Sequence, residues 1–439
     1  MAEKTRRGPL PILLVVLDGM PDRPYRSLDG RTPMETACTP TMDSLAREGQ
    51  SGFYYPLGPG RIPSTELAHF RIFGYEAHPF PGRACLEALG HEVPCTPGDV
   101  FSFLAPRRVE RGPNGAFYVV GGYGERAKHA PAVCSALDGW TDEASGYRFE
   151  VFPINGGEAI LRIRQGDASE SPIGEVTDSD PFFFTDLPVL RPRPLASASR
   201  PETAVRTADA LNRFLLEAAG TFEGGSSKTG AETLLVSKWM GTFVHLPPFA
   251  GLAGTAGASV ASSGLFRGLA RLIGLEFFHE PDGDLSGKLD RALGILETGE
   301  VGFVHVHTKV ADEAAHSGDP AHKVEVIEGL DREIAALREL PPDRLVLCVT
   351  SDHCTPVGGR SVHWGDSVPL LVRGPYVRVD GMTLFDERSA TRGSLGQIGA
   401  GDVLPYLLCQ ADRAHFKGAR PTPGEVLGIP QSGEAWPGP

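Results

Sequence analysis

The sequence predicts an α/β fold in which one large core carries a smaller inserted lobe. Its 439 residues exceed the roughly 250–300 at which a single hydrophobic core usually stops growing. Long apolar runs alternate with helical patterns near both ends of the chain, whereas the middle has short strand-like pieces between Gly, Pro and Ser. We therefore expect a core over residues 1–91 and 236–439, with helices on both faces of its sheet, and an inserted α+β lobe over residues 92–235.

Three continuous apolar runs predict strands that are buried on both faces, as in a parallel sheet covered by helices. These runs are residues 12–17, 302–306 and 345–350. Asp18-Gly19 ends the first run, and Ser351-Asp352-His353 ends the last.

Helical signals lie between these runs. A helix over residues 40–48 is predicted because Thr39 suits the N-cap, Pro40 the first helical position and Gly49 the stop. Leucines at helical spacing predict two further helices, over residues 265–273 and 289–296.

The inserted lobe shows shorter elements. Strand-like pieces cover residues 116–120, 147–151 and 159–163, and one clear helix covers residues 201–219. This order of elements is typical of an α+β lobe.

Composition narrows the class of protein. A hydrophobic fraction of 41% and a charged fraction of 22% are those of a globular chain, and they exclude collagen, coiled coil and wholesale disorder. The net charge of −13 argues against a nucleic-acid partner, which requires a basic face. No stretch approaches the roughly 20 apolar residues of a membrane span, so we expect no membrane partner.

Cysteine usage and the N-terminus predict a cytoplasmic location. The 7 cysteines are thinly spread and form no CxxC pair, which fits a reducing compartment. Lys4, Arg6 and Arg7 followed by an apolar run imitate a signal peptide. That run is short, however, and ends at Asp18-Gly19 without a small-residue cleavage site.

Acidic residues follow the three predicted strands of the core. Asp18 and Asp352 come after the first and last strands, and Asp312 lies a few residues beyond the middle one. In open α/β sheets, ligands bind beyond the carboxyl ends of the strands, so these carboxylates should converge. A single Asp after a strand is more often a helix cap or turn former, and only the whole pattern is specific.

Three histidines accompany these carboxylates. His316 lies four residues after Asp312, which places both on one face of a helical turn. His353 directly follows Asp352, and His363 lies beyond a Gly-Gly turn. Three carboxylates and three imidazoles can hold two divalent metal ions with mixed oxygen and nitrogen ligands, for which Zn or Mn is suitable.

The order D-G, DxxxH, T-S-D-H and a later His resembles the alkaline phosphatase superfamily, and most closely its archaeal-type cofactor-independent phosphoglycerate mutases. The resemblance extends through residues 82–90, 207–214 and 266–274 and covers most of the chain. It implies an alkaline-phosphatase-like core. It also implies one metal on Asp312, His316 and His363, and a second on Asp18, Asp352, His353 and a nucleophile hydroxyl.

The family's nucleophile segment matches residues 63–69, Pro-Ser-Thr-Glu-Leu-Ala-His. In this register Thr65 falls on the nucleophile, while Glu66 and His69 match their counterparts. Ser64 is the alternative nucleophile, with Thr65 then a turn residue. Because metal coordination lowers the pKa of a hydroxyl, Thr65 could attack without a dedicated base.

The substrate contacts look rebuilt relative to the mutases. Segments at residues 112–116, 155–159 and 237–241 lack almost all the Arg and His expected of the family, so we expect a small phosphorylated substrate other than 3-phosphoglycerate. Candidate phosphate contacts are Lys238, Lys309 and Arg83, the last with a supporting structural role as its alternative.

Three other side chains are open to two interpretations. Trp239 could belong to the core or stack on a substrate ring. His305 and His307, which alternate on one predicted strand, could line the cleft or belong to the core.

These features together predict a two-metal phosphotransferase of the phosphomutase type, acting through a covalent phospho-threonine. The main alternative is a metal-dependent phosphatase or phosphodiesterase, in which water resolves the intermediate. A binding protein that retained the fold without catalysis is the third possibility.

Overall fold

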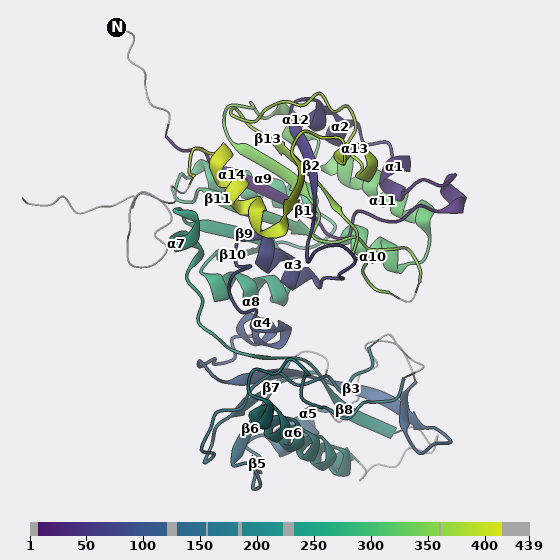
Figure 1. Cartoon of the computed structure of the whole chain (residues 1–439), viewed down its shortest axis with the longest axis vertical. Coiled ribbons are helices and arrows are strands. Elements are labelled where there is room, and N and C mark those ends of the chain that lie inside the picture. The colour runs from purple at the N-terminus through teal and green to yellow at the C-terminus, as the bar shows by residue number, and fades with distance from the viewer. Residues whose placement is uncertain are drawn as a thin grey trace, which may run out of the picture. The chain divides into compact units, whose positions relative to one another are not determined.

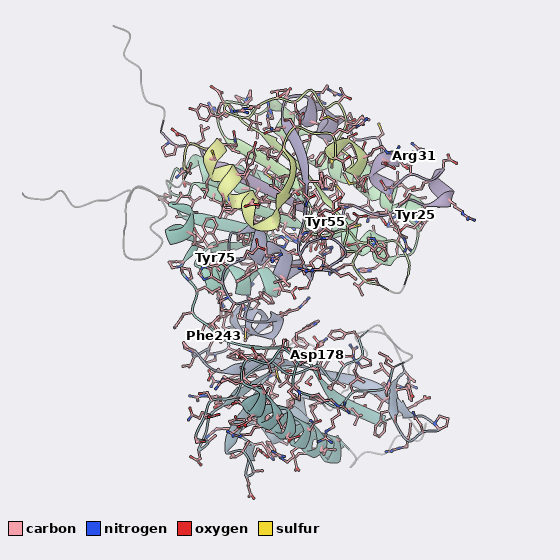
Figure 2. The ribbon with its side chains drawn as sticks, viewed as in Figure 1. Tyr25, Arg31, Tyr55, Tyr75, Asp178 and Phe243 are labelled. Carbon is pink, nitrogen blue, oxygen red and sulfur yellow. The ribbon has the colours of Figure 1, made fainter. Side chains whose placement is uncertain are left out.

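The computed structural model describes residues 8–120, 130–154, 157–182, 187–222, 232–359 and 361–414. The chain forms two compact units (Figure 1). The first comprises Met1–His78, Leu246–Phe266 and Ala270–Pro439, and the second comprises Pro79–His245 and Arg267–Leu269. Tyr25, Arg31, Tyr55 and Tyr75 lie in the first unit, and Asp178 and Phe243 lie in the second (Figure 2).

The expected lobe over residues 92–235 lies inside the second unit, which also includes helix α4 (Arg83–Gly90). This helix packs on the sheet of the second unit, and that packing accounts for the wider bounds. The basic residues of the signal-peptide alternative, at positions 4, 6 and 7, lie outside the described residues, as do residues 155 and 156.

The first unit is built on an eight-stranded mixed sheet (Figure 1). Its centre is parallel, and antiparallel pairing occurs only on the two sides of β13. All six residues of β1 are buried, as expected for a central strand covered on both faces. In sheet order the strands are β10 (Glu276–His279), β9 (Gly257–Ala261), β11 (Phe303–Thr308), β1 (Ile12–Leu17), β12 (Val346–Thr350), β13 (Val368–Arg373), β2 (Gln50–Tyr55) and β14 (Gly396–Gly399).

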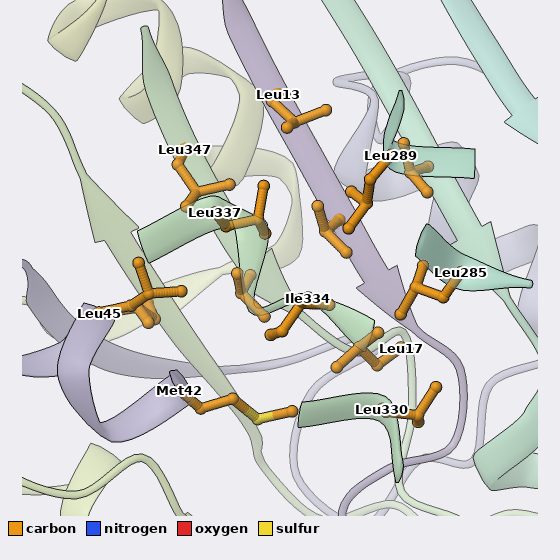
Figure 3. Packing of buried hydrophobic residues seen from close by; sticks show 14 of the residues in the cluster. Leu13, Leu17, Met42, Leu45, Leu285, Leu289, Leu330, Ile334, Leu337 and Leu347 are labelled. Carbon is orange, nitrogen blue, oxygen red and sulfur yellow. The ribbon is translucent and has the colours of Figure 1, made fainter. Parts of the chain in front are cut away.

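Helices cover both faces of this sheet. On one face, Leu13 and Val304 join an apolar cluster with α2 (Pro40–Arg47), α9 (Leu285–Glu297) and α11 (Pro320–Glu333) (Figure 3). Successive strand residues point to opposite faces, so Phe303 lies on the other side. There its ring contacts Phe73, at the end of α3 (Thr65–Ile72), and Phe249 of α7 (Phe249–Ala253), with centroids 6.1 and 4.8 Å apart. The predicted α/β core is confirmed.

The other described helices of the first unit are short, and α8 lies only partly in this unit, since Arg267–Leu269 belong to the second unit. They are α1 (Pro33–Thr36), α8 (Gly264–Ile273), α10 (Val310–His316), α12 (Ala336–Glu339), α13 (Glu387–Ala390) and α14 (Val403–Gln410). Among the described residues, no helix combines the length and the apolar character needed to cross a bilayer.

The second unit contains a six-stranded sheet and the long helix α6 (Pro201–Phe222). Phe149 and Phe214 stack between them, with ring centroids 4.9 Å apart. This confirms the α+β lobe, to which α5 (Ala130–Leu137) also belongs. Its strands are β3 (Val100–Arg111), β4 (Phe117–Val119), β5 (Thr141–Asp142), β6 (Tyr147–Pro153), β7 (Ala159–Arg164) and β8 (Glu232–Thr242).

Candidate active site

The three predicted carboxylates meet at one edge of the first unit's sheet. β1 pairs in parallel with both β11 and β12, so the carboxyl ends of these three strands lie side by side. Asp18 follows β1, Asp352 follows β12, and Asp312 lies on α10 just after β11. All three side chains are buried. The structure therefore shows the predicted convergence of these three carboxylates.

Asp18, Asp352 and His353 form the first ligand group. One ligand atom from each lies within 4.8 Å of the other two. His353 Nε2 is 3.2 Å from Asp18 Oδ1 and 3.2 Å from Asp352 Oδ2. Among the described residues, neither of these buried carboxylate oxygens has a hydrogen-bond partner. Since an unpaired buried acceptor is costly, the two oxygens fit a site that receives a cation.

The pKa shifts of these three residues also favour a site that receives a cation. Burial raises the pKa of Asp18 well above its ordinary value, and the charge of Asp312 raises it further. Burial and the neighbouring Asp18 likewise raise the pKa of Asp352. Burial lowers the pKa of His353, which favours the neutral imidazole that a metal ligand must be. A divalent cation would relieve the repulsion between the carboxylates.

Asp312, His353 and His363 form the second ligand group, again with one atom from each within 4.8 Å of the others. His363 Nε2 is 3.8 Å from Asp312 Oδ1, and the His363 ring stacks on His353 with centroids 3.6 Å apart. His363 Nδ1 lies 2.7 Å from the carbonyl oxygen of Pro63. A carbonyl can only accept, so Nδ1 carries the proton and Nε2 keeps the lone pair that a metal needs.

His316 contacts this second group from one side. Its Nε2 lies 3.4 Å from Asp312 Oδ2, as expected for residues four apart on a helix. Burial alone would raise the pKa of Asp312, but the hydrogen bond with His316 and the nearby His353 lower it below the ordinary value. The group whose ligand atoms lie within 4.8 Å of one another contains His353, whereas the resemblance implied His316 in that position. The oxygen and nitrogen donors of both groups suit Zn or Mn.

Thr65 lies beside the ligand groups. It is the first residue of α3, Ser64 is the N-cap, and Thr65 Oγ1 is 3.0 Å from His353 Nε2. His69 Nδ1 lies 2.8 Å from the backbone oxygen of Thr65, to which it must donate. The first helical turn therefore presents Thr65 to the ligand groups. The role of Thr65 as nucleophile stays a prediction.

His307 touches the first ligand group, which resolves one choice that the sequence left open. Its Nε2 lies 3.1 Å from Asp18 Oδ2, and its backbone oxygen accepts a hydrogen bond from the buried Lys288. His305, two residues earlier on the same strand, instead bonds to Ser259 at 3.0 Å. The alternation on β11 indicated a shared face for the two histidines, but it could not tell which of them reaches a carboxylate.

The predicted phosphate contacts fall into two places. Lys309 Nζ is 3.8 Å from Asp312 Oδ2, beside the ligand groups and half exposed. Lys238 and Arg83 lie in the second unit, where they flank Trp239 with their charged groups 4.2 and 4.0 Å from its indole centroids. Their substrate roles stay predictions.

Trp239 organises an aromatic and charged cluster within the second unit. Its ring lies 5.2 Å from that of Phe103, and its φ of 61° is unusual for a non-glycine residue. Burial lowers the pKa of Lys238 to about 8. Burial also raises the pKa of Asp178, which accepts backbone hydrogen bonds from Trp239, to about 6. Trp239 is thus held by cations and rings of its own unit.

Comparison with known proteins supports the resemblance. Residues 10–409 match the family model of the "Metalloenzyme superfamily". A 2,3-bisphosphoglycerate-independent phosphoglycerate mutase of Methanopyrus kandleri is 34% identical over 425 residues, covering 93% of this chain and 98% of the relative. One from Methanocaldococcus jannaschii is 31% identical over 421 residues, covering 93% of this chain and 95% of the relative.

Solved structures agree with these relatives. PH0037 from Pyrococcus horikoshii superimposes with a TM-score of 0.72 at 25% identity, covering 94% of this chain and 100% of that one. The cofactor-independent phosphoglycerate mutase from Thermoplasma acidophilum gives a TM-score of 0.61 at 28% identity, covering 92% and 100%. The mutases are named for phosphoglycerate, so they do not support the expectation of a different substrate. The chain belongs to the metalloenzyme superfamily, as a metal-dependent phosphotransferase similar to the 2,3-bisphosphoglycerate-independent phosphoglycerate mutases.

Proposed function

We propose that the chain is a phosphomutase that moves a phosphoryl group between hydroxyls of a small phosphorylated metabolite by way of phospho-Thr65. The observation that best supports this is the position of Thr65 Oγ1, 3.0 Å from His353 Nε2. His353 belongs to both ligand groups, so the hydroxyl lies where both could act on it.

The residues that would hold two divalent ions, Mn or Zn, are those of the two ligand groups. Bound ions neutralise the transferring group and lower the pKa of a coordinated hydroxyl. The set comprises Asp312, His316 and His363 for one ion, and Asp18, Asp352, His353 and Thr65 for the other.

Thr65 supplies the covalent step. Its Oγ1 forms a bond to phosphorus as the bond from phosphorus to the substrate oxygen breaks, and in net balance the hydroxyl proton passes to that departing oxygen. A second hydroxyl of the substrate then takes the phosphoryl group, and Thr65 regains its proton. His69 supports this step by fixing the Thr65 backbone through its 2.8 Å hydrogen bond.

Phosphoglycerate is the first substrate to test, because the relatives carry its name. A partner of this class is small and anionic, which suits the cationic side chain of Lys309 beside the ligand groups. Lys238 and Arg83, in the second unit, stay predicted contacts. We also infer a cytoplasmic location, which is supported by the state of the 7 cysteines, all of them free.

The test uses metal-loaded enzyme and ³¹P NMR, with 3-phosphoglycerate and a panel of other phosphomonoesters as substrates. We expect isomerised phosphoester and a phosphorylated Thr65 peptide by mass spectrometry. Thr65→Val should lower turnover by about 10⁴-fold or more, the scale seen when a nucleophile is deleted. Ser64→Ala is the matched control and should keep its activity.

Two results would contradict parts of this proposal. Full turnover by Thr65→Val would remove the nucleophile assignment. Release of inorganic phosphate as the sole product, unaffected by acceptor alcohols, would identify a hydrolase instead.

A further inference from the structure

Thr355 lies between the two ligand groups and bonds to one member of each. It follows Asp352 and His353 in the loop after β12, and its side chain is fully buried. Its hydroxyl donates to Asp312 Oδ1 at 2.9 Å, and His353 Nδ1 lies 3.0 Å from Thr355 Oγ1. One hydroxyl therefore joins a carboxylate of the second group to the imidazole shared by both.

The direction of these two hydrogen bonds follows from the number of protons. A hydroxyl has a single proton, and that of Thr355 goes to Asp312. The Thr355 oxygen can then only accept from His353, so Nδ1 of that ring must carry the imidazole proton. Nε2 keeps its lone pair, and it is Nε2 that lies 3.2 Å from both Asp18 Oδ1 and Asp352 Oδ2.

The surroundings hold Thr355 firmly. Its N–H donates to the backbone oxygen of Pro21 at 3.0 Å, and its own backbone oxygen accepts from the fully buried Lys323 at 2.7 Å. Gly19 packs directly on the hydroxyl, because a Cβ there would lie 2.5 Å from Thr355 Oγ1. The φ of Gly19, +67°, also favours glycine. Small movements of Thr355 are thus resisted from several sides.

We propose that Thr355 is a positioning residue that couples the two metal sites, by fixing the tautomer of His353 and the orientation of Asp312 through a single hydroxyl. This inference rests on the proposed two-metal function. Partners of this kind, one bond away from the ligands, typically contribute about 10–100-fold to metal affinity. Because one hydroxyl serves both groups, its loss should weaken both sites together.

The experiment compares Thr355→Val with Thr355→Ser and a matched control, Thr350→Val. Valine keeps the shape of threonine and removes the hydroxyl, whereas serine restores it. Thr350 is equally buried, but its hydroxyl donates to the backbone oxygen of Pro369 at 2.7 Å rather than to a ligand side chain. Dissociation constants for Mn²⁺ are measured by chelator competition, with stoichiometry by elemental analysis and melting temperature of the metal-free protein alongside.

We expect Thr355→Val to weaken both Mn²⁺ sites by about 10–100-fold, with Thr355→Ser and Thr350→Val close to wild type. Unchanged affinities in Thr355→Val would overturn the inference, and weakening of one site alone would overturn the coupling. Wild-type protein that binds no divalent metal would instead overturn the proposed function.

A second measurement does not depend on the valine variant folding. Long-range ¹H–¹⁵N NMR of the metal-free wild-type protein reports which nitrogen of His353 is protonated. A proton on Nδ1 is the expected result. A proton on Nε2 would overturn the assigned direction of the hydrogen bonds.

Discussion

Two pairs of buried carboxylates, one pair in each unit, differ in the side chains that surround them. In the first, Asp18 Oδ1 and Asp352 Oδ2 are buried and, within the described part of the chain, lack hydrogen-bond partners. In the second, Asp180 and Asp142 are also buried, but each is held by an arginine, Arg107 at 2.7 Å and Arg213 at 2.7 Å. These two acids of the second unit are neutralised by its own arginines, whereas Asp18 and Asp352 of the first unit lie where an added cation would neutralise them.

The largest expected effect comes from removing one carboxylate in each unit. Asp352→Asn should lower metal affinity by more than about 100-fold and abolish turnover, because a ligand is lost. It should not destabilise the metal-free protein, since the mutual repulsion of Asp352 and Asp18 disappears. Metal titration and urea unfolding of the metal-free protein measure the two effects.

Asp180→Asn, in the second unit, should instead lower stability and leave metal binding unchanged. It removes the buried carboxylate charge that Arg107 pairs with and should cost about 3–5 kcal/mol of unfolding free energy. Metal stoichiometry should stay at the wild-type value. If Asp180→Asn lost metal, or if Asp352→Asn bound it normally, the contrast between the units would be wrong.

The next largest change in metal affinity is expected from substitution of His307 in the first unit. His307→Leu removes the hydrogen bond to Asp18 Oδ2 and should weaken metal binding by about 10-fold or more. His307→Gln, which can still donate, should recover part of the affinity. His305→Leu is the matched control on the same strand and should leave the affinity unchanged, since His305 bonds to Ser259. Chelator competition distinguishes the three variants, and equal losses from both leucine variants would point to packing instead.

The sequence was sufficient to predict that Asp18, Asp312 and Asp352 converge, because each of them follows a strand that an apolar run indicates. Their role as metal ligands stays a prediction. The run of residues 12–17 forms β1 without adjustment, and Asp312 and His316 share a face of α10. Sheet topology then brings the strand ends together. Hydrogen-bond direction has no such signal, so the hydrogen bonds of Thr355 to Asp312 and of His307 to Asp18 become visible only in the structure.

Two local features show where sequence patterns fail. Pro106 argues against a strand, yet it lies within the twelve-residue β3. β3 pairs with β7 through Val100–Leu104 and with β4 through Val109–Arg111, so this edge is unpaired at Pro106 and needs no N–H there. Thr39 is the N-cap of α2 as predicted, but its side chain makes no cap; the carboxylate of Asp331, distant in sequence, accepts from the first turn.

A smaller effect should appear in the second unit as a pH dependence. The buried Lys238, with its pKa lowered to about 8, loses its charge at a lower pH than an ordinary lysine. If Lys238 binds an anionic substrate, KM should rise by up to about tenfold per pH unit above pH 8. Lys238→Arg should remove this rise, because arginine stays charged, and should leave metal affinity unchanged. A KM that is flat from pH 7 to 9 in the wild-type enzyme would exclude Lys238 from substrate binding.

The smallest effect concerns stability. In the metal-free protein, Asp352 holds its proton in the folded state above the carboxyl pKa of about 3.9 in the unfolded chain. The unfolded state then binds fewer protons, so folding stability falls as pH rises from about 4 through the raised pKa. Relative to Asp352→Asn, the wild-type protein should lose up to about 1.4 kcal/mol per pH unit in this window. Parallel urea-unfolding curves with a chelator present test this, and a constant difference would contradict it.

We expect two divalent ions to bind among Asp18, Thr65, Asp312, His316, Asp352, His353 and His363. Anomalous diffraction from crystals of the Mn²⁺-loaded protein tests it most directly. Two manganese peaks are expected. One should contact Asp312, His316 and His363, and the other should contact Asp18, Asp352, His353 and Thr65 Oγ1. The absence of both peaks, or peaks that these side chains do not contact, would contradict it.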